Sequence, residues 1–229
     1  MLAIVQARMS SHRLPGKVLR PLAGRPMLAW LFDRLRTAER VDRIIVATSD
    51  GAKDDAICAF CFDVGIECFR GSLDDVAQRL AAAAEWAGEA AFVRICGDSP
   101  LMASDVVDEI IALFETVQVD LATNVQVRTF PNGTSVEALS VSALRRARSM
   151  MQLGEAEHVT PVFYRRPQDF RIVNLTSGGD FGHVQMSVDT ESDFALAERM
   201  ISALRGCAGR LGLADLITLR EQCGAGGSQ

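Results

Sequence analysis

The chain has 229 residues, enough for one large domain or two small ones, and 48% of them are hydrophobic, which allows a sizeable core. Its net charge of −5 argues against a general nucleic-acid binder, because phosphate backbones demand basic surfaces. No apolar run is long enough to span a bilayer, and the N-terminus lacks the pattern of a signal peptide. We therefore expect a cytoplasmic protein with no membrane or nucleic-acid partner.

Strand-like and helix-like segments alternate through the first half of the chain. Leu28, Leu31 and Leu35 recur at helical spacing, while Ser72 and Ser104 stand where helix N-caps are expected. Repeated strand–helix units predict an α/β fold with a mostly parallel sheet and helices on both faces. Strands are predicted at 2–6, 43–49, 66–71 and 91–98, and helices at 26–38, 53–65, 72–90 and 104–117.

The second half is less regular, and we interpret it as the substrate-binding portion of a single domain. Thr190 can cap a helix at 190–205, with Asp193 completing a capping box. The other predicted elements are strands at 135–140, 170–176 and 183–188, and helices at 143–151 and within 155–167. The predicted organisation is one domain over 1–222, with a nucleotide-binding part at about 1–125, a sugar-binding and dimer part at about 126–185, a returning strand and helix at 186–205, and a disordered tail at 223–229.

Cations gather in the loop that follows the first predicted strand. Ligands of open parallel sheets bind beyond the carboxyl ends of the strands, which is where this loop lies. Lys17 is a compact charge suited to phosphate, Arg13 can bind phosphate oxygens in two-pronged fashion, and Gly16 permits close approach of the backbone. The P-loop pattern is absent. The loop therefore predicts a polyphosphate site, and a solvated basic loop remains the alternative.

Two aspartates complete the predicted site. Asp98 follows the strand at 91–98, and Asp189 stands between a predicted strand and a predicted helix. Mg²⁺ is commonly held by one or two carboxylates together with substrate phosphates, so these residues and the basic loop together predict a metal–nucleotide site. Each aspartate alone is more often a helix cap or a turn residue than a metal ligand.

Two of the six cysteines, Cys58 and Cys61, form a C-x-x-C pair. No second pair or nearby histidine completes a zinc site, so we interpret them as two small buried side chains on a helix. Reduced thiols are expected in a cytoplasmic protein.

The segment 5–19, VQARMSSHRLPGKVL, resembles the signature A-R-x-x-S-x-R-x-P-x-K of the cytidylyltransferases that activate acidic sugars. These include the acylneuraminate and 3-deoxy-manno-octulosonate (KDO) enzymes, and the resemblance is greatest to the spore-coat polysaccharide biosynthesis protein F branch. It extends to about residue 205. The motifs that follow in the same order are ATSD (47–50), FRGSLDDV (69–76), GDSPL (97–101), EHVTP (157–161) and VDTESDF (188–194).

The resemblance implies a Rossmann-like nucleotide-diphospho-sugar transferase fold, a homodimer and a Mg²⁺-dependent reaction for polysaccharide or glycan biosynthesis. In that reaction a hydroxyl of an acidic sugar attacks the α-phosphate of CTP and releases pyrophosphate. The residues it implicates are Arg13, Lys17 and Asp98 in catalysis, Ala7, Arg8, Ser11, Arg13, Lys17 and Arg70 in nucleotide binding, and Asp98 and Asp189 in metal binding.

The sugar side is less specific. By resemblance, Glu137 in the segment 130–139 and His158 are candidates for sugar binding, although Asn132-Gly133 is first of all a turn signal and a lone helical histidine is commonly structural. Three arginines could hold the acid group of the sugar and are not ranked by the sequence: Arg128, Arg165 and Arg166.

One departure affects the choice of base. The KDO branch has a base-reading glutamine two residues before the aspartate that matches Asp98, and this chain has Cys96 there. A thiol is a poor hydrogen-bonding substitute for a carboxamide.

The sequence leaves three functions open. A CTP-dependent cytidylyltransferase accounts for the most residues. A glycosyltransferase or another nucleotidyltransferase of the same fold is the alternative, although Asp98-Ser99-Pro100 lacks the second carboxylate of a D-x-D motif. A non-catalytic nucleotide- or sugar-binding module is the third.

Overall fold

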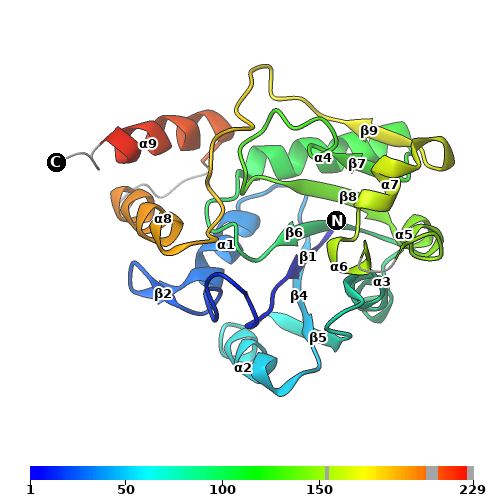
Figure 1. Ribbon diagram of the computed structural model, residues 1–229, viewed down its shortest axis with the longest axis horizontal. Helices are drawn as coiled ribbons and strands as arrows, with labels where there is room; N and C mark the ends of the chain where they lie inside the picture. The colour runs from blue at the N-terminus through cyan, green and yellow to red at the C-terminus, as the bar shows by residue number, and fades with distance from the viewer. Residues whose placement is uncertain (153–154, 205–210, 226–229) are drawn as a thin grey trace.

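The apolar run at the start of the chain forms a central strand, β1 (Leu2–Gln6), of a seven-stranded sheet (Figure 1). The computed structural model describes residues 1–152, 155–204 and 211–225. Leu2 and Ile4 are buried in one hydrophobic core, whereas Ala3 and Val5 are buried in a second core on the opposite face. Because both faces of β1 are covered, its sequence is continuously apolar rather than alternating.

The sheet is mostly parallel, as predicted. β8 runs antiparallel to both of its neighbours, β6 and β7, and the other neighbouring pairs are parallel. β1 and β6 lie side by side with Gln6 opposite Cys96, so their carboxyl ends meet at one edge. From one side to the other the strands are β5 (Glu67–Gly71), β4 (Arg43–Ser49), β1, β6 (Ala91–Cys96), β8 (Val136–Ser140), β7 (Leu121–Thr123) and β9 (Ile172–Asn174).

Helices cover both faces of this sheet, which confirms the predicted fold class. One core contains apolar side chains of α1, α2, α4 and α8, with α9 packed against it, and the other contains those of α3, α5 and α7. The helices are α1 (Met27–Arg36), α2 (Asp55–Asp63), α3 (Val76–Trp86), α4 (Ser104–Val117), α5 (Val141–Arg148), α6 (Glu155–His158), α7 (Pro161–Arg165), α8 (Glu191–Ala203) and α9 (Leu213–Ala225), with short 3₁₀ turns at Ala52–Asp54 and Pro167–Asp169 and a small hairpin of β2 (Pro21–Leu22) and β3 (Arg25–Pro26).

Two of the three predicted helix caps are wrong. Asp75, not Ser72, caps α3 by accepting a hydrogen bond from Gln78 N, and Ser72 Oγ instead accepts from Asp75 N within the preceding turn. Ser104 lies inside the first turn of α4, where its hydroxyl is buried without a partner among the described residues. Acidic and hydroxyl residues near a helix start are all capable caps, so the backbone path decides which one acts.

The cap of α8 is confirmed. The Thr190 hydroxyl accepts a hydrogen bond from Asp193 N, and the Asp193 carboxylate accepts one from Thr190 N at 2.8 Å. This reciprocal pair fixes the point at which the chain leaves Asp189 and enters the helix.

The strand predicted at 183–188 is not formed. This segment makes only an isolated bridge between Gln185 and Asn132, because its backbone is held by the loop around Asn132 rather than by a sheet strand. The tail predicted to be disordered at 223–229 is helical up to Ala225, where α9 ends. Residues 226–229 lie outside the described part of the chain.

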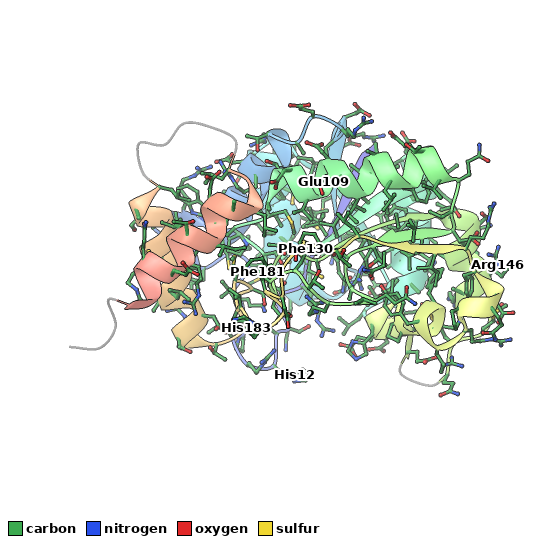
Figure 2. The ribbon with its side chains drawn as sticks, turned by 90° about the horizontal axis from the view of Figure 1, so that it is seen from above. His12, Glu109, Phe130, Arg146, Phe181 and His183 are labelled. Atoms are coloured by element: carbon green, nitrogen blue, oxygen red, sulfur yellow. The ribbon has the colours of Figure 1, made fainter. Side chains whose placement is uncertain are left out.

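The loops at 129–135 and 181–187 lie against each other and carry the chain towards Asp189. Phe181 N donates to Thr129 O at 2.8 Å, and Figure 2 shows Phe130 and Phe181 where the two segments meet. Gly133 makes the contact possible: its φ is +97°, and a Cβ there would lie 2.4 Å from Ser187 N. Gly133 is therefore required by its contact with Ser187 as well as by its turn.

Replacing Gly133 by alanine should destabilise the fold by about 3 kcal/mol, because the new methyl group collides with backbone and the residue must keep a positive φ. Urea unfolding checks this. Gly65 is a matched control, since its φ is also positive (+67°) but no atom lies within 4 Å of the point that a Cβ would occupy there. Gly65→Ala should cost only about 1 kcal/mol. Equal losses in the two variants would contradict the packing argument.

Candidate active site

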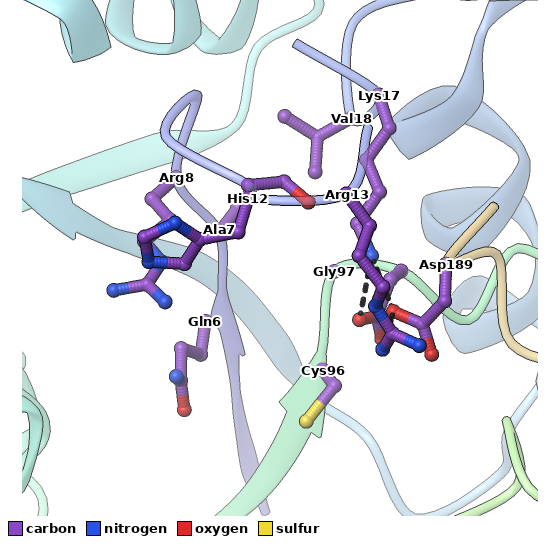
Figure 3. Close-up of a pocket in the computed structure, with 12 residues that line it drawn as sticks. Gln6, Ala7, Arg8, His12, Arg13, Lys17, Val18, Cys96, Gly97 and Asp189 are labelled. Carbon is purple, nitrogen blue, oxygen red and sulfur yellow. Dashed lines mark hydrogen bonds and ion pairs between the residues drawn. The ribbon is translucent and has the colours of Figure 1, made fainter. Parts of the chain in front are cut away.

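A polar pocket opens at the edge where β1 and β6 end (Figure 3). Arg13, Lys17 and Asp189 lie together on one side of the pocket, where Asp98 pairs with Lys17. Gln6 lies on the other side, near Arg8 and His12. This is the edge at which open α/β sheets bind their ligands. The lining residues are Gln6, Ala7, Arg8, Ser11, His12, Arg13, Lys17, Val18, Cys96, Gly97, Asp98 and Asp189.

The two aspartates are brought together by a backbone hydrogen bond. Val188 N donates to Asp98 O at 2.9 Å, which joins the loop after β6 to the segment that precedes α8. Asp189 N in turn donates to the Asp193 carboxylate at 3.1 Å, so the position of Asp189 depends on the first turn of α8. Residues 91 positions apart in the sequence thus present carboxylates to one pocket.

Lys17 lies between these carboxylates. Its ammonium nitrogen is 3.1 Å from Asp98 Oδ2 and 3.0 Å from Asp189 Oδ1, and it donates a third hydrogen bond to Val188 O at 2.6 Å (Figure 3). The Lys17 side chain is only 7% exposed, while those of Asp98 and Asp189 are 30% and 25% exposed. Arg13 Nη2 lies 3.1 Å from Asp189 Oδ1 on the solvent side. A buried ammonium is stable here because all three of its donors are satisfied and two anions neutralise it.

The structure therefore places the predicted cations and acids in one pocket. It also places Ala7, Arg8 and Ser11 there, although their predicted roles in nucleotide binding stay predictions. Sequence reasoning missed Gln6 and assigned no role to His12, which both line the same pocket.

Two predicted residues lie elsewhere. Arg70 does not line the pocket; it donates to Ser49 O and Gly51 O and forms an ion pair with Asp55 at 2.6 Å. His158 is exposed on α6 and does not line the pocket either. The contact that α6 makes with the loop comes from Glu157, the preceding residue, which pairs with Arg8 at 2.6 Å.

Glu137, the predicted sugar-binding carboxylate, is almost completely buried, with 4% of its side chain exposed. One of its oxygens accepts from the Arg94 guanidinium and the other from the Tyr164 hydroxyl, the latter at 2.6 Å. Burial and the Glu137 charge raise the pKa of Tyr164 above its usual value, so Tyr164 remains a donor. In this structure both Glu137 oxygens are therefore occupied by protein donors. Its predicted contact with sugar stays a prediction.

Cys96 provides no charge to the pocket. Burial raises the pKa of its thiol to about 11, with Asp98 and Glu137 acting in the same direction and Arg94 against them. The thiol therefore stays protonated at neutral pH, a weak donor and a weak acceptor.

Three further cysteines lie together where α2 packs against β5: Cys58, Cys61 and Cys68. Cys58 Sγ lies 3.3 Å from Cys68 Sγ, and Cys61 is fully buried. Within the described residues no cluster of three or more metal-ligating side chains occurs. Burial raises the pKa of the Cys58 thiol to about 11, which does not favour reactivity.

Asp54 holds the basic loop in place, a role that the sequence did not reveal. Its fully buried carboxylate accepts a hydrogen bond from Met9 N at 2.7 Å and others from the Ser49 N–H and hydroxyl. The loop after β1 is thereby tied to the end of β4. Burial opposes the charge on Asp54, but these hydrogen bonds outweigh it and hold the pKa below the usual value of 3.8. The only feature of the sequence that pointed to Asp54 was its position in the polar segment after β4.

Solved structures similar to this one indicate its fold. A cytidylyltransferase from Leptospira borgpetersenii is 27% identical and superimposes with a TM-score of 0.90 over 97% of this chain and 94% of that one. CMP:2-keto-3-deoxy-manno-octonic acid synthetase, in complex with CTP, is 15% identical with a TM-score of 0.65, covering 88% of this chain and 98% of that one. The fold is thus that of the nucleotidyltransferases.

Sequence comparison identifies the family. The family model described as cytidylyltransferase matches residues 2–205, and the chain therefore belongs to the cytidylyltransferase family. It is 31% identical to the spore coat polysaccharide biosynthesis protein SpsF of Bacillus subtilis, over 96% of this chain and 93% of that protein. It is 33% identical to an uncharacterized protein of Methanocaldococcus jannaschii, over 86% of this chain and 81% of that protein. No helix among the described residues has the length and apolar character needed to cross a membrane.

Replacing Asp54 by asparagine should lower the free energy of unfolding at neutral pH by about 2 kcal/mol, because a carboxamide cannot accept all the bonds that the carboxylate accepts. A carboxylate with a lowered folded-state pKa stabilises the fold above its unfolded pKa and ceases to do so as the pH falls through the folded value. The difference between wild type and variant should therefore be constant from about pH 8 to about pH 5 and shrink below about pH 4.

Urea unfolding at a series of pH values measures this difference. Asp63→Asn, at an exposed carboxylate near the end of α2, is the control and should change stability little at any pH. A difference for Asp54→Asn that persists unchanged down to about pH 3 would show that the charged carboxylate is not its source.

Proposed function

We propose that this protein transfers CMP from CTP to a hydroxyl of an acidic sugar and releases pyrophosphate. The observation that supports this most strongly is the convergence of Arg13, Lys17, Asp98 and Asp189 on one pocket at the carboxyl edge of the sheet. Membership of the cytidylyltransferase family agrees with CTP as the nucleotide donor.

The charge of the pocket supports a divalent cation. Three cationic side chains and two carboxylates line it, which leaves a net charge of one positive unit from Arg8, Arg13, Lys17, Asp98 and Asp189. A triphosphate carries about four negative charges at neutral pH. The aspartates would repel it unless a cation lay between them and the phosphates.

The donor set fits Mg²⁺. Each aspartate has one oxygen that Lys17 does not contact, Oδ1 of Asp98 and Oδ2 of Asp189, and both side chains are partly exposed. Mg²⁺ is typically bound by one or two carboxylates, with phosphates and water filling the other positions. When bound by Asp98 and Asp189, Mg²⁺ would supply charge neutralisation and orientation of the α-phosphate.

The protein's own cations perform the remaining tasks. Transfer of a nucleotidyl group needs positioning and neutralisation of charge more than covalent catalysis by the protein. Arg13 is exposed enough to bind phosphate oxygens in two-pronged fashion, while Lys17 is buried and held by two carboxylates. Both would offset the charge that develops on the departing pyrophosphate.

Two of the three arginines suggested for the acid group of the sugar already have carboxylate partners. Arg165 pairs with Glu155 at 2.7 Å and Arg166 pairs with Asp169 at 2.6 Å. In contrast, Nη1 of Arg128 is buried and has no hydrogen-bond partner among the described residues. An unpaired buried donor is costly, so Arg128 is our candidate for binding the carboxylate of the acceptor.

The biological role remains a proposal as well. SpsF of Bacillus subtilis is described as a spore coat polysaccharide biosynthesis protein, and we propose polysaccharide or glycan biosynthesis for this chain by analogy. The predicted homodimer and cytoplasmic location stay predictions.

Replacing Lys17 by methionine should lower kcat/KM for pyrophosphate release by at least about 100-fold, because an oriented cation at the developing charge is lost. The assay is coupled pyrophosphate detection with CTP, Mg²⁺ and a panel of acidic sugars. The chain has a single other lysine, Lys53, which is exposed, so Lys53→Met is a control of the same chemistry and should retain activity.

Two results would contradict the proposal. One is wild-type protein that neither binds nor turns over CTP with any acidic sugar and shows no thermal shift with any of the four nucleoside triphosphates. The other is Lys17→Met protein with the activity of wild type. Circular dichroism and thermal unfolding verify that the variant is folded.

A further inference from the structure

The side of the pocket opposite Lys17 and Asp189 contains a carboxamide that the proposed phosphate chemistry does not use. Gln6 is the last residue of β1, lies directly opposite Cys96 on β6, and lines the pocket together with it (Figure 3). Its side chain is partly exposed, in contrast to the four buried residues before it. Gln6 thus ends a strand that is otherwise wholly within the core.

The orientation of this carboxamide is fixed by its neighbour. Arg94 Nε lies 3.0 Å from Gln6 Oε1. An arginine side chain can only donate hydrogen bonds, so the Gln6 atom facing it must be the oxygen. The amide nitrogen is therefore turned away from Arg94. It is not among the buried unpaired atoms and makes no hydrogen bond with the rest of the described chain, which leaves its two N–H donors for a ligand.

Arg94 is itself held rigidly. Its guanidinium pairs with Glu137, whose second oxygen accepts from Tyr164, and the Tyr164 hydroxyl also lies 3.1 Å from Thr123 Oγ1. The Arg94 and Glu137 side chains are 12% and 4% exposed. A buried network with satisfied donors and acceptors gives its members one arrangement, so Gln6 is prevented from flipping.

We propose that Gln6 reads the base of the nucleotide by donating its amide N–H to N3 of cytosine, with Arg94 as the positioning residue that fixes its orientation. The inference rests on the proposed function and assigns the base to this end of the pocket. It follows from the distribution of charge. The triphosphate needs the side with Lys17 and Arg13. On the Gln6 side the cation is Arg8, which Glu157 already neutralises at 2.6 Å, so the carboxamide there suits an uncharged heterocycle.

The chemistry distinguishes cytosine from uracil. Ring position 3 is an acceptor in cytosine and an N–H donor in uracil. A fixed N–H donor therefore forms a hydrogen bond with N3 of cytosine. Facing uracil, the same donor meets another N–H group and cannot form one. Sites built around such a polar group discriminate strongly, because the mismatch leaves both groups unpaired. Gln6 also supplies, from the neighbouring strand, a carboxamide beside the weakly bonding thiol of Cys96.

The test is isothermal titration calorimetry of CTP and UTP with Mg²⁺, without an acceptor sugar. Wild type should prefer CTP. Gln6→Met keeps the volume but removes the donor, so its Kd for CTP should rise about tenfold while its Kd for UTP stays nearly constant. Gln6→Glu retains a partner for Arg94 but presents an acceptor to the pocket. The Kd for UTP divided by the Kd for CTP should therefore be lower in Gln6→Glu than in Gln6→Met. The added negative charge weakens both nucleotides alike, so it does not change this ratio.

Arg94→Lys separates positioning from folding. It keeps a cation for Glu137 but removes the Nε–H that orients Gln6, so the preference for CTP should fall several-fold while affinity for inorganic triphosphate is retained. Gln78→Met, on the exposed surface of α3, is the control and should leave both nucleotide affinities unchanged. Thermal unfolding establishes that each variant is folded.

The outcomes are distinguishable. A folded Gln6→Met protein that retains the wild-type preference for CTP overturns the base-reading role and leaves the proposed function standing. Wild type that binds CTP and UTP equally overturns the base-reading role too, while leaving the triphosphate site intact. Wild type that binds no nucleoside triphosphate overturns both proposals.

Discussion

The ammonium group of Lys17, held between Asp98 and Asp189, is the interaction on which the rest of the pocket depends. A lysine removed from water is stable only with anions and acceptors around it, and this one has two carboxylates and a backbone carbonyl. These partners come from the loop after β6 and from the segment before α8. Satisfying one cation therefore joins three segments that are far apart in the sequence.

The same requirement operates at the other end of the pocket. Arg94 is also nearly buried, and it is neutralised by Glu137 rather than by an aspartate. The two buried cations differ in geometry: the lysine is a compact charge between two acids, while the arginine holds its partners in a fixed fork. One end of the pocket consequently contains a closely packed group of opposite charges, and the other contains a carboxamide whose orientation Arg94 fixes.

Sequence patterns predicted the layered architecture well, because each central strand is a short apolar run and each covering helix has a periodic apolar face. β1 and the Thr190–Asp193 capping box are local in origin, and both were predicted correctly. The failures were also physical. Several residues could cap α3, and the backbone path chose Asp75; the segment 183–188 has the composition of a strand, but Gly133 lets it pack against a loop instead.

The sequence by itself determined the chemistry available at the site. It places a basic loop after the first strand, Asp98 after β6 and Asp189 before α8, at positions that resemble those of the cytidylyltransferases. It could do so because strand ends and loop residues are encoded locally. The tertiary structure alone decided which groups meet. In the folded chain Glu137 is a buried partner of Arg94, and Arg70 pairs with Asp55 outside the pocket. Asp54 holds the basic loop, and Gln6 lines the pocket. Those outcomes depend on strand order and register, which arise from packing across the whole sheet and not from any one segment of the chain.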